Sequence, residues 1–209
     1  MSPAARKSPV YGARGAKMTE FSGTANRDLG PAEPPPPGAV ARLFDEAAIA
    51  ARVADLAQEI SRTMPDPFTV VGLLKGSFVF VADLVRALDR AGRRPRVDFI
   101  TLSSYGMARE SSGTVRLVGA PPEDIAGRAV LLVDDVADTG RSLVFARDLL
   151  LGLGASEVRS CALLDKPARR AVAVPLDFIG FTLGDVFVAG YGIDHAEQYR
   201  HLPYLGAVA

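Results

Sequence analysis

Residues 130–143 read VLLVDDVADTGRSL, and this stretch decides the fold class. The apolar run Ala129–Val133 predicts a buried strand, and the apolar segment Ser142–Leu151 predicts a helix that ends at Gly152 and Gly154. The loop between such a strand and a helix start normally attracts anions. Three aspartates nevertheless precede this helix, at positions 134, 135 and 138. A ligand of this loop must therefore suit both an anion-binding helix start and a group of acidic side chains.

Strands and helices alternate on both sides of this stretch. The predicted helices cover residues 45–63 and 78–91, and the predicted strands cover 68–74, 97–102, 158–164 and 178–182, with a hairpin arm at 115–118. This order predicts an α/β fold with a mostly parallel central sheet that is flanked by helices on both faces. Ligands bind at the carboxyl ends of the strands in such sheets, which is where the three aspartates lie.

Composition excludes several classes of protein. The 209 residues contain 24 basic and 24 acidic side chains, so the net charge is zero and a general affinity for nucleic acid or anionic membrane is not expected. No apolar run approaches the ~20 residues of a transmembrane helix. The single cysteine, Cys161, excludes an intrachain disulfide and suits a reducing compartment, so we expect a cytoplasmic protein.

The chain divides into a tail and a folded domain. Seven of the fifteen prolines fall within residues 1–40, including the run Pro34–Pro37. Such a segment cannot bury enough apolar surface to become ordered. We therefore expect a disordered tail over residues 1–38 and one folded domain over 39–209.

The opening stretch suggests its own ligand. Backbone N–H groups of residues 139–142 can hold a phosphate, helped by the Thr139 and Ser142 hydroxyls and by the close backbone approach that Gly140 permits. Ionised Asp134 and Asp135 are hydrogen-bond acceptors, which suits the hydroxyls of a sugar. A ribose 5-phosphate has both the phosphate and the hydroxyl groups that these residues would bind. In the structural alternative, Asp138 is only an N-cap and the other two acids a solvated strand end, but three acids followed by TGRS fit that poorly.

These residues resemble the phosphoribosyl-pyrophosphate (PRPP) loop of the type I phosphoribosyltransferases. The resemblance extends over most of residues 40–209, through VGLLKGSFVF (71–80), SSYG (103–106), LLDKPARR (163–170) and FVAGYGIDHAEQYRHLPYLG (187–206). The last two segments are similar to bacterial members that use the 6-oxopurines hypoxanthine and guanine. The resemblance implies the fold of that family, with a small hood formed by the N- and C-terminal segments. It also implies purine salvage, in which PRPP and the base give IMP or GMP with Mg²⁺, in a homodimer or homotetramer.

The resemblance assigns the PRPP loop. Residues 138–142, Arg141 included, bind the 5-phosphate, Asp134 and Asp135 bind the ribose hydroxyls, and Asp138 is the general acid or base at purine N7. Members of the family commonly have glutamate at the first position of the acidic pair. We therefore expect the shorter Asp134 to reach the ribose hydroxyl through a water molecule.

The resemblance assigns further residues as well. Lys75 and Gly76 resemble the pyrophosphate loop, which has a non-proline cis peptide bond, and Arg200 is also assigned to pyrophosphate. Asp194 binds Mg²⁺ together with Asp134 and Asp135. For the purine, Lys166 donates to O6, Phe187 stacks on the ring, and the Val188 backbone lies at its edge. Ser104 and Tyr105 begin a mobile lid.

Each of these residues also has a purely structural interpretation. Lys75 and Lys166 would be surface lysines, Phe187 a core residue, and Asp194 the N-cap of a helix that carries His195, Arg200 and His201 on its surface. Against this, the folded domain has only two lysines, at 75 and 166, in a chain with twenty arginines. The two lysines that remain therefore suggest that both motifs need a compact ammonium group. The histidines are six residues apart and no third ligand is evident, so a zinc site is not predicted.

Two alternative functions remain open at this point. A guanine- or xanthine-preferring enzyme would use the same residues, because Lys166 suits any 6-oxopurine. A PRPP-sensing regulator that binds nucleic acid would use the same fold, but the zero net charge and the base-binding set Lys166, Phe187 and Asp194 argue against it.

Overall fold

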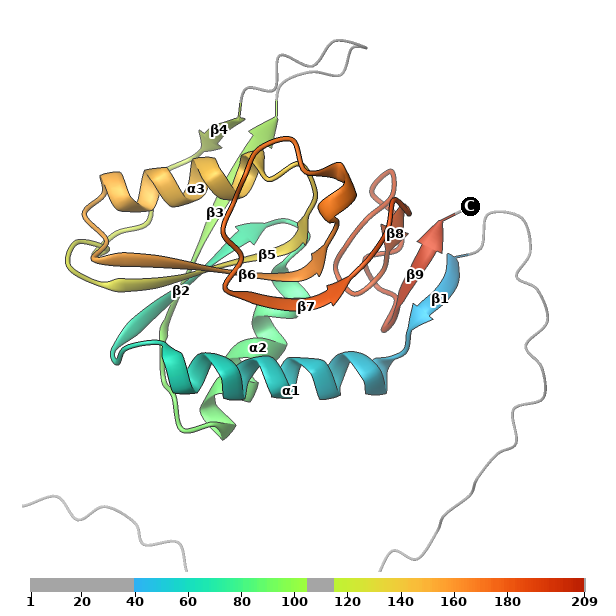
Figure 1. The fold of residues 1–209 in the computed structure, drawn as a ribbon, viewed down its shortest axis with the longest axis horizontal. Coiled ribbons are helices and arrows are strands. Elements are labelled where there is room, and N and C mark those ends of the chain that lie inside the picture. The colour runs from blue at the N-terminus through green and yellow to red at the C-terminus, as the bar shows by residue number, and fades with distance from the viewer. Residues whose placement is uncertain (1–39, 105–114, 209) are drawn as a thin grey trace, which may run out of the picture. The chain divides into compact units, whose positions relative to one another are not determined.

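The computed structural model describes residues 40–104 and 115–208, all within the compact unit Pro35–Ala209 (Figure 1). Its main sheet has six strands in the order β4-β3-β2-β5-β6-β7. Their bounds are Phe68–Leu74 (β2), Arg96–Ser104 (β3), Val115–Val118 (β4), Ala129–Ala137 (β5), Glu157–Asp165 (β6) and Phe178–Thr182 (β7). All neighbours are parallel except β3 and β4, which confirms the predicted sheet and its hairpin arm.

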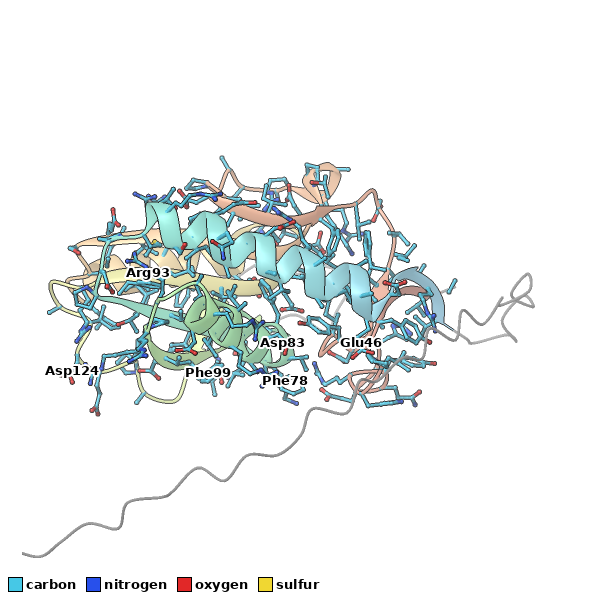
Figure 2. The ribbon with its side chains drawn as sticks, turned by 90° about the horizontal axis from the view of Figure 1, so that it is seen from below. Glu46, Phe78, Asp83, Arg93, Phe99 and Asp124 are labelled. Carbon is cyan, nitrogen blue, oxygen red and sulfur yellow. The ribbon has the colours of Figure 1, made fainter. Side chains whose placement is uncertain are left out.

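Helices cover both faces of this sheet, as predicted. The helices α1 (Glu46–Thr63) and α2 (Phe78–Arg90) pack together on one face, and α3 (Arg141–Gly152) lies on the other (Figures 1 and 2). Asp45 caps the start of helix α1, because its carboxylate accepts a hydrogen bond from the Ala48 backbone N–H at 2.8 Å. A short 3-10 helix, η1 (Pro167–Arg169), follows β6.

Two apolar cores follow from the alternation of side chains along the strands. In β5, Leu131 and Val133 pack toward α1 and α2, whereas Val130 and Leu132 pack toward α3. Cys161 lies in the first core and is fully buried, and burial raises the pKa of its thiol. Within the described ranges, no helix has both the length and the apolar character needed to cross a membrane.

The two ends of the described chain form a second, small sheet. Strands β1 (Val40–Phe44), β9 (Leu205–Val208) and β8 (Val188–Ala189) are antiparallel in the order β1-β9-β8. Gly206 lies so close to β1 that a Cβ atom there would be 2.4 Å from Val40 Cγ1. This sheet is the hood that the resemblance implied.

Two expectations about local structure were wrong. Strand β5 does not end at Val133 but continues through the two aspartates to Ala137, because Asp134, Val136 and Ala137 pair with β6. No helix follows Asp194 within the described residues. The chain there forms a tight turn in which Ala196 and Glu197 have positive φ, a conformation that a right-handed helix cannot contain.

Candidate active site

A small pocket lies between the end of β5 and the start of α3. It has a volume of about 50 Å³ and is lined by Asp134, Val136, Ala137, Asp138, Thr139, Gly140, Ser142 and Leu143. Gly140 precedes α3 with φ +84°, and a Cβ atom there would be 2.8 Å from the Val172 carbonyl oxygen, so only glycine fits without strain. The N-cap residue Gly140 offers no side-chain acceptor, and the hydrogen bond from the Arg141 N–H to Thr139 Oγ1 is long, at 3.5 Å, so the first turn of this helix can still bind an anion.

Asp138 does not cap the helix, so the interpretation of Asp138 as only an N-cap was wrong. Its Oδ1 accepts a hydrogen bond of 2.8 Å from Arg169 Nε, and Arg169 also donates to Asp185 Oδ1 at 2.9 Å. Arg169 and Asp185 were not among the predicted site residues. The only signal in the sequence was that Arg169 lies three residues after Lys166, within the same motif.

Asp134 and Asp135 are not a solvated strand end either. Asp134 is buried, and its Oδ1 accepts a hydrogen bond of 3.0 Å from the Asp135 backbone N–H. Burial raises the pKa of both carboxyls, and the neighbouring Asp135 raises that of Asp134 further. For Asp135, the nearby Arg200 partly opposes this rise. A hydroxyl-bearing ligand or a cation at this pair would therefore relieve an electrostatic cost.

The loop after β2 packs tightly against these acids. The Leu74–Lys75 peptide bond is cis, as the resemblance implied, and a Cβ atom on Gly76 would be 2.2 Å from Asp135 Oδ2. Gly192 packs on the other side of the same loop, where its own Cβ would be 2.5 Å from the Gly76 carbonyl oxygen. The glycines thus bring residues 75–76, the acidic pair and the segment that begins at 192 into one place.

A hydrogen bond from the hood segment to α2 supports this arrangement. The Tyr191 hydroxyl donates to Asp83 Oδ2 at 2.6 Å. Asp83 lies on α2 (Figure 2), whose start follows the Lys75 loop directly. Burial and the neighbouring Asp83 raise the pKa of Tyr191, so the hydroxyl stays protonated and can donate.

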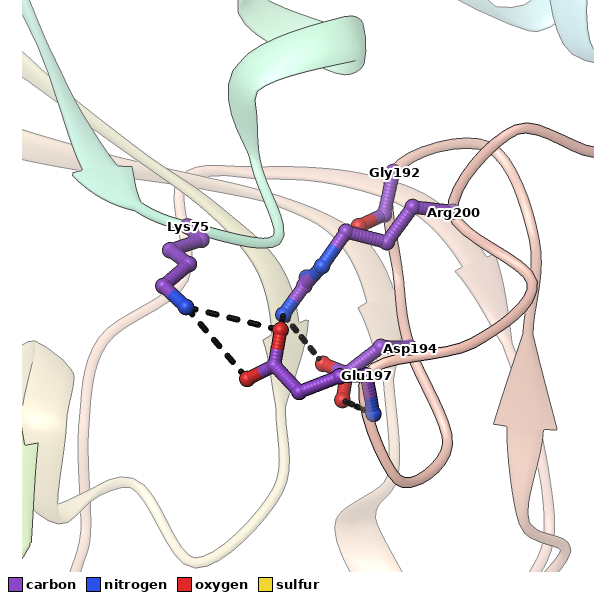
Figure 3. Close-up of polar contacts among 5 residues, drawn as sticks. All are labelled: Lys75, Gly192, Asp194, Glu197 and Arg200. Atoms are coloured by element: carbon purple, nitrogen blue, oxygen red, sulfur yellow. Dashed lines mark hydrogen bonds and ion pairs between the residues drawn. The ribbon is translucent and has the colours of Figure 1, made fainter.

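Four charged side chains meet beside these glycines (Figure 3). Arg200 donates to the Gly192 carbonyl oxygen at 2.9 Å and forms an ion pair of 2.7 Å with Asp194 Oδ1. Lys75 Nζ lies 3.3 Å from Glu197 Oε1, and the Glu197 backbone N–H donates to Asp194 Oδ2 at 2.9 Å. The structure therefore brings together Lys75, Asp194 and Arg200, which the sequence analysis had singled out separately, and adds Glu197, which it had not.

The predicted purine residues Lys166 and Phe187 lie near each other, and Lys166 lies within the electrostatic influence of Asp138. Lys166 is only 7% exposed, so it is not a surface lysine, and its Nζ lies 6.0 Å from the centroid of the Phe187 ring. Burial lowers the pKa of Lys166, and the charge of Asp138 opposes this effect. Phe187 is 55% exposed, so it is not a core residue, and it packs edge-to-face on His195 with ring centroids 4.8 Å apart.

Val188 anchors Phe187 in the hood. It is buried and pairs with Ala207 of β9, and the Phe187 carbonyl oxygen accepts a hydrogen bond of 2.9 Å from the Val208 backbone N–H. Ser104 is the last residue of β3 and pairs with Val115. Tyr105 and the rest of the predicted lid lie outside the described residues.

Comparison with known proteins agrees with this geometry. The sequence model of a family described as "Phosphoribosyl transferase domain" matches residues 39–196. The hypoxanthine phosphoribosyltransferase of Escherichia coli K12 is 44% identical over 169 residues, which cover 79% of this chain and 93% of that one. The hypoxanthine-guanine phosphoribosyltransferase of Aquifex aeolicus is 46% identical over 163 residues, which cover 77% and 90%.

Solved structures give the same result. A hypoxanthine phosphoribosyltransferase from Staphylococcus aureus superposes with a TM-score of 0.75 at 32% identity, covering 80% of this chain and 90% of that one. The Trypanosoma cruzi enzyme in complex with the product IMP gives 0.74 at 32% identity, covering 80% and 93%. Because the family model spans most of the chain and the relatives are matched almost end to end, the chain belongs to the phosphoribosyltransferase family, in the group that contains the hypoxanthine phosphoribosyltransferases.

Proposed function

We propose that this protein transfers the 5-phosphoribosyl group of PRPP to hypoxanthine or guanine, which yields IMP or GMP and pyrophosphate. The observation that supports this most directly is that groups suited to each part of the substrates adjoin one another. Asp134 and Asp138 line the same small pocket, and the charge of Asp138 acts on Lys166. Asp135 packs against Gly76, next to Lys75. A phosphoribosyl group bound at the acidic pair would therefore have residues for the base and residues for the leaving group within reach.

The sugar phosphate fits the middle of the site. Backbone N–H groups at residues 139–142 and the hydroxyls of Thr139 and Ser142 would bind the 5-phosphate, with Arg141 beginning the helix beside it. Asp134 and Asp135 would accept hydrogen bonds from the ribose hydroxyls. The pocket is small and is lined by Thr139, Gly140 and Ser142, so it would take the phosphate group and leave the sugar outside, next to the two acids.

The base would be recognised by donors and by an aromatic face. The Lys166 ammonium has three donors and no acceptor, so it suits O6 of hypoxanthine or guanine. Phe187 exposes its ring for stacking, with the Val188 backbone at the edge of the purine. Asp138 would take the proton from purine N7 as the new bond to C1 forms. Its Oδ1 accepts from Arg169, so Oδ2 would be the oxygen that takes the proton.

The departing pyrophosphate would be bound by cations. Lys75 and Arg200 would offset its negative charge as it leaves C1 of the ribose. When bound, Mg²⁺ would supply further charge neutralisation on the same oxygens. Magnesium is usually held by one or two carboxylates together with substrate phosphates.

The acids of this chain suit that kind of site. Within the described residues, no group of three or more His, Cys, Asp or Glu side chains could hold a metal ion by itself. Asp134, Asp135 and Asp194 would instead complete their site with oxygens of the substrate. The raised pKa of Asp134 and Asp135 supports a cation there, because a positive charge would favour their ionised forms.

A lid would protect the reacting centre. We propose that the segment which begins at Ser104 and Tyr105 closes over the bound substrates and keeps water from capturing the sugar cation.

We also propose a cytoplasmic homodimer or homotetramer. The free buried thiol of Cys161 is consistent with a reducing compartment.

One assay tests the proposed function. The purified chain is mixed with PRPP, Mg²⁺ and hypoxanthine, guanine, xanthine or adenine in turn, and nucleotide formation is followed. Turnover of hypoxanthine supports the proposal, and the ratio of kcat/KM values ranks the bases. Binding of nucleic acid without any turnover would identify a regulator instead, and turnover of guanine or xanthine alone would correct the base preference.

A further inference from the structure

Glu197 occupies an unexpected position in the pyrophosphate part of the site. Its carboxylate lies between the two cations, with Oε1 and Oε2 at 3.3 and 3.4 Å from Lys75 Nζ and with Oε2 at 3.4 Å from Arg200 (Figure 3). Lys75 follows β2 and Arg200 follows the hood strand β8, so the two cations come from distant parts of the chain. In the described structure, Glu197 is the side chain that connects them.

The backbone at this point favours a different residue. His195 and Gln198 exchange two backbone hydrogen bonds, of 3.2 and 3.0 Å, around the central pair Ala196 and Glu197. Both central residues have positive φ, 52° and 61°. Two-residue turns of this kind favour Asn, Asp or Gly, because a larger side chain crowds the backbone. A glutamate held in this conformation indicates a function for its side chain.

The contacts of Glu197 are suited to displacement. The Lys75 and Glu197 side chains are 66% and 70% exposed, and exposed ion pairs are weak. Arg200 keeps stronger partners, the Gly192 carbonyl oxygen and Asp194, whether or not Glu197 is present. Arg200 can therefore release Glu197 and keep its place, and Lys75 would lose only a weak, exposed contact. An anion that binds both of them would meet the Glu197 carboxylate at the same position and be repelled by it.

We propose that Glu197 is an internal counter-anion that competes with the pyrophosphate group for Lys75 and Arg200. It keeps the two cations facing each other while the site is empty, and it must turn away when PRPP or pyrophosphate binds. This inference rests on the proposed function, because it takes these cations as the pyrophosphate site. Its consequence is that Glu197 lowers the affinity of the site for pyrophosphate and so favours release of that product.

The test is the affinity for inorganic pyrophosphate in the presence of Mg²⁺, measured by titration calorimetry on the full chain. Glu197→Gln keeps the size of the side chain and removes its charge. We expect its dissociation constant for pyrophosphate to fall by about two- to five-fold, the range of exposed ion pairs. The KM for PRPP should fall in the same direction, whereas the KM for hypoxanthine should not change, because the base binds at Lys166 and Phe187.

Two further variants make the result specific. Glu197→Gly also removes the charge and suits the turn, so it should bind pyrophosphate more tightly without a loss of thermal stability. Glu123→Gln removes the same charge from an exposed residue near Thr69 and Arg96, at the amino ends of β2 and β3, and should bind as the unmodified chain does.

Each contrary outcome has a distinct meaning. Unchanged or weaker binding of pyrophosphate by Glu197→Gln and Glu197→Gly would overturn the inference and leave the proposed function intact. An equal gain in Glu123→Gln would also overturn it, because the effect would then be one of net charge alone. If the unmodified chain neither binds pyrophosphate nor turns over PRPP, the proposed function fails and the inference fails with it.

Discussion

Lys166 carries a buried ammonium group. We expect a bound ligand to accept a hydrogen bond from it. Within the described residues no carboxylate forms an ion pair with it, and its ammonium lies over the Phe187 ring at a distance of 6.0 Å. A buried ammonium that lacks a close partner is costly, which is why the pKa of Lys166 is lowered. Purine O6 would supply the missing acceptor, whereas the amino group of adenine would bring a second donor to the same point.

This contrast predicts the effect of Lys166→Gln. The amide can turn to accept as well as donate, so we expect most activity on hypoxanthine and guanine to be lost while the disadvantage of adenine shrinks. A buried donor that faces another donor costs several kcal/mol, about 1–3 for a neutral group and more for a charged one. The measurement is kcat/KM for all three bases in both proteins.

The same variant provides its own folding control. Because Lys166→Gln removes a buried charge, its melting temperature near neutral pH should be no lower than that of the unmodified chain. The lowered pKa means that the unmodified chain gains stability as the pH rises from the folded pKa of Lys166 toward its unfolded value of about 10.4, so the advantage of the variant should shrink over that range. Unaffected 6-oxopurine turnover would remove Lys166 from base recognition.

Asp138 gives a second prediction for a single residue. Its carboxylate pairs with Arg169 and does not cap α3, so Asp138→Asn should leave that helix intact. If Asp138 exchanges the purine proton, kcat should fall by about 10²–10⁴, while PRPP binding survives. The readouts are steady-state kcat and a separate titration with PRPP.

A matched control separates chemistry from the ion pair. Asp185→Asn removes the other carboxylate that Arg169 contacts but no proposed acid–base group, so its kcat should stay close to that of the unmodified chain. Equal losses in both variants would show that the Arg169 contacts matter more than proton transfer. A near-normal kcat in Asp138→Asn would remove Asp138 from the chemistry altogether.

The elements were predictable where their side chains repeat regularly. Helix α1 was found from Ile49, Val53, Leu56 and Ile60, which are all buried, and β2 was found from its continuous apolar run. The extension of β5 to Ala137 was not predictable, because pairing with β6 and not apolar character keeps Asp134 in the sheet. The hood strands were expected only from the resemblance, because β1 and β9 lie at opposite ends of the domain and are short.

The residues of the site also divide into those that the sequence indicated and those that only the tertiary structure reveals. Glu197 and Asp185 could not be found from local patterns, because their partners Lys75, Arg200 and Arg169 are brought to them by tertiary packing. The turn at 196–197 was mistaken for the beginning of a helix, because no glycine or asparagine marks its positive φ angles. Glycines at 76 and 192 were visible in the sequence, but the close approaches that require them were not.

The hood can be tested through Gly206. A Cβ atom at this position would be 2.4 Å from Val40 Cγ1 and 2.7 Å from the Ala41 carbonyl oxygen, so Gly206→Ala should push β1 and β9 apart. Since β9 also pairs with β8, which carries Val188 next to Phe187, we expect the KM for hypoxanthine to rise more than the affinity for pyrophosphate falls. Both constants and the melting temperature are measured on the same preparation.

Gly152→Ala is the control for that substitution. It makes the same chemical change at the end of α3, where a Cβ atom would meet nothing within 4 Å, and should be neutral or slightly stabilising, since alanine favours a helix by about 1 kcal/mol. If Gly206→Ala behaves like this control, the hood tolerates the extra methyl group and does not depend on close contact between β1 and β9.

At the scale of the whole molecule, both apolar cores and both sheets lie within residues 40–104 and 115–208. The residues that we propose bind the phosphate, the base and the pyrophosphate lie in the same ranges. The first described residue, Val40, already pairs with Val208 near the other end of the chain. The predicted tail over residues 1–38 lies outside the described residues.

Deletion of residues 2–38 tests whether the proline-rich segment contributes. A segment with this composition offers little apolar surface to bury, so its removal should leave the free energy of unfolding nearly unchanged. We expect the melting temperature and kcat/KM for hypoxanthine to match those of the full chain, because strand β1 and its register with β9 are retained. A large drop in melting temperature would mean that the segment packs on the domain. A large drop in kcat/KM at constant melting temperature would place it at the active site or at the lid.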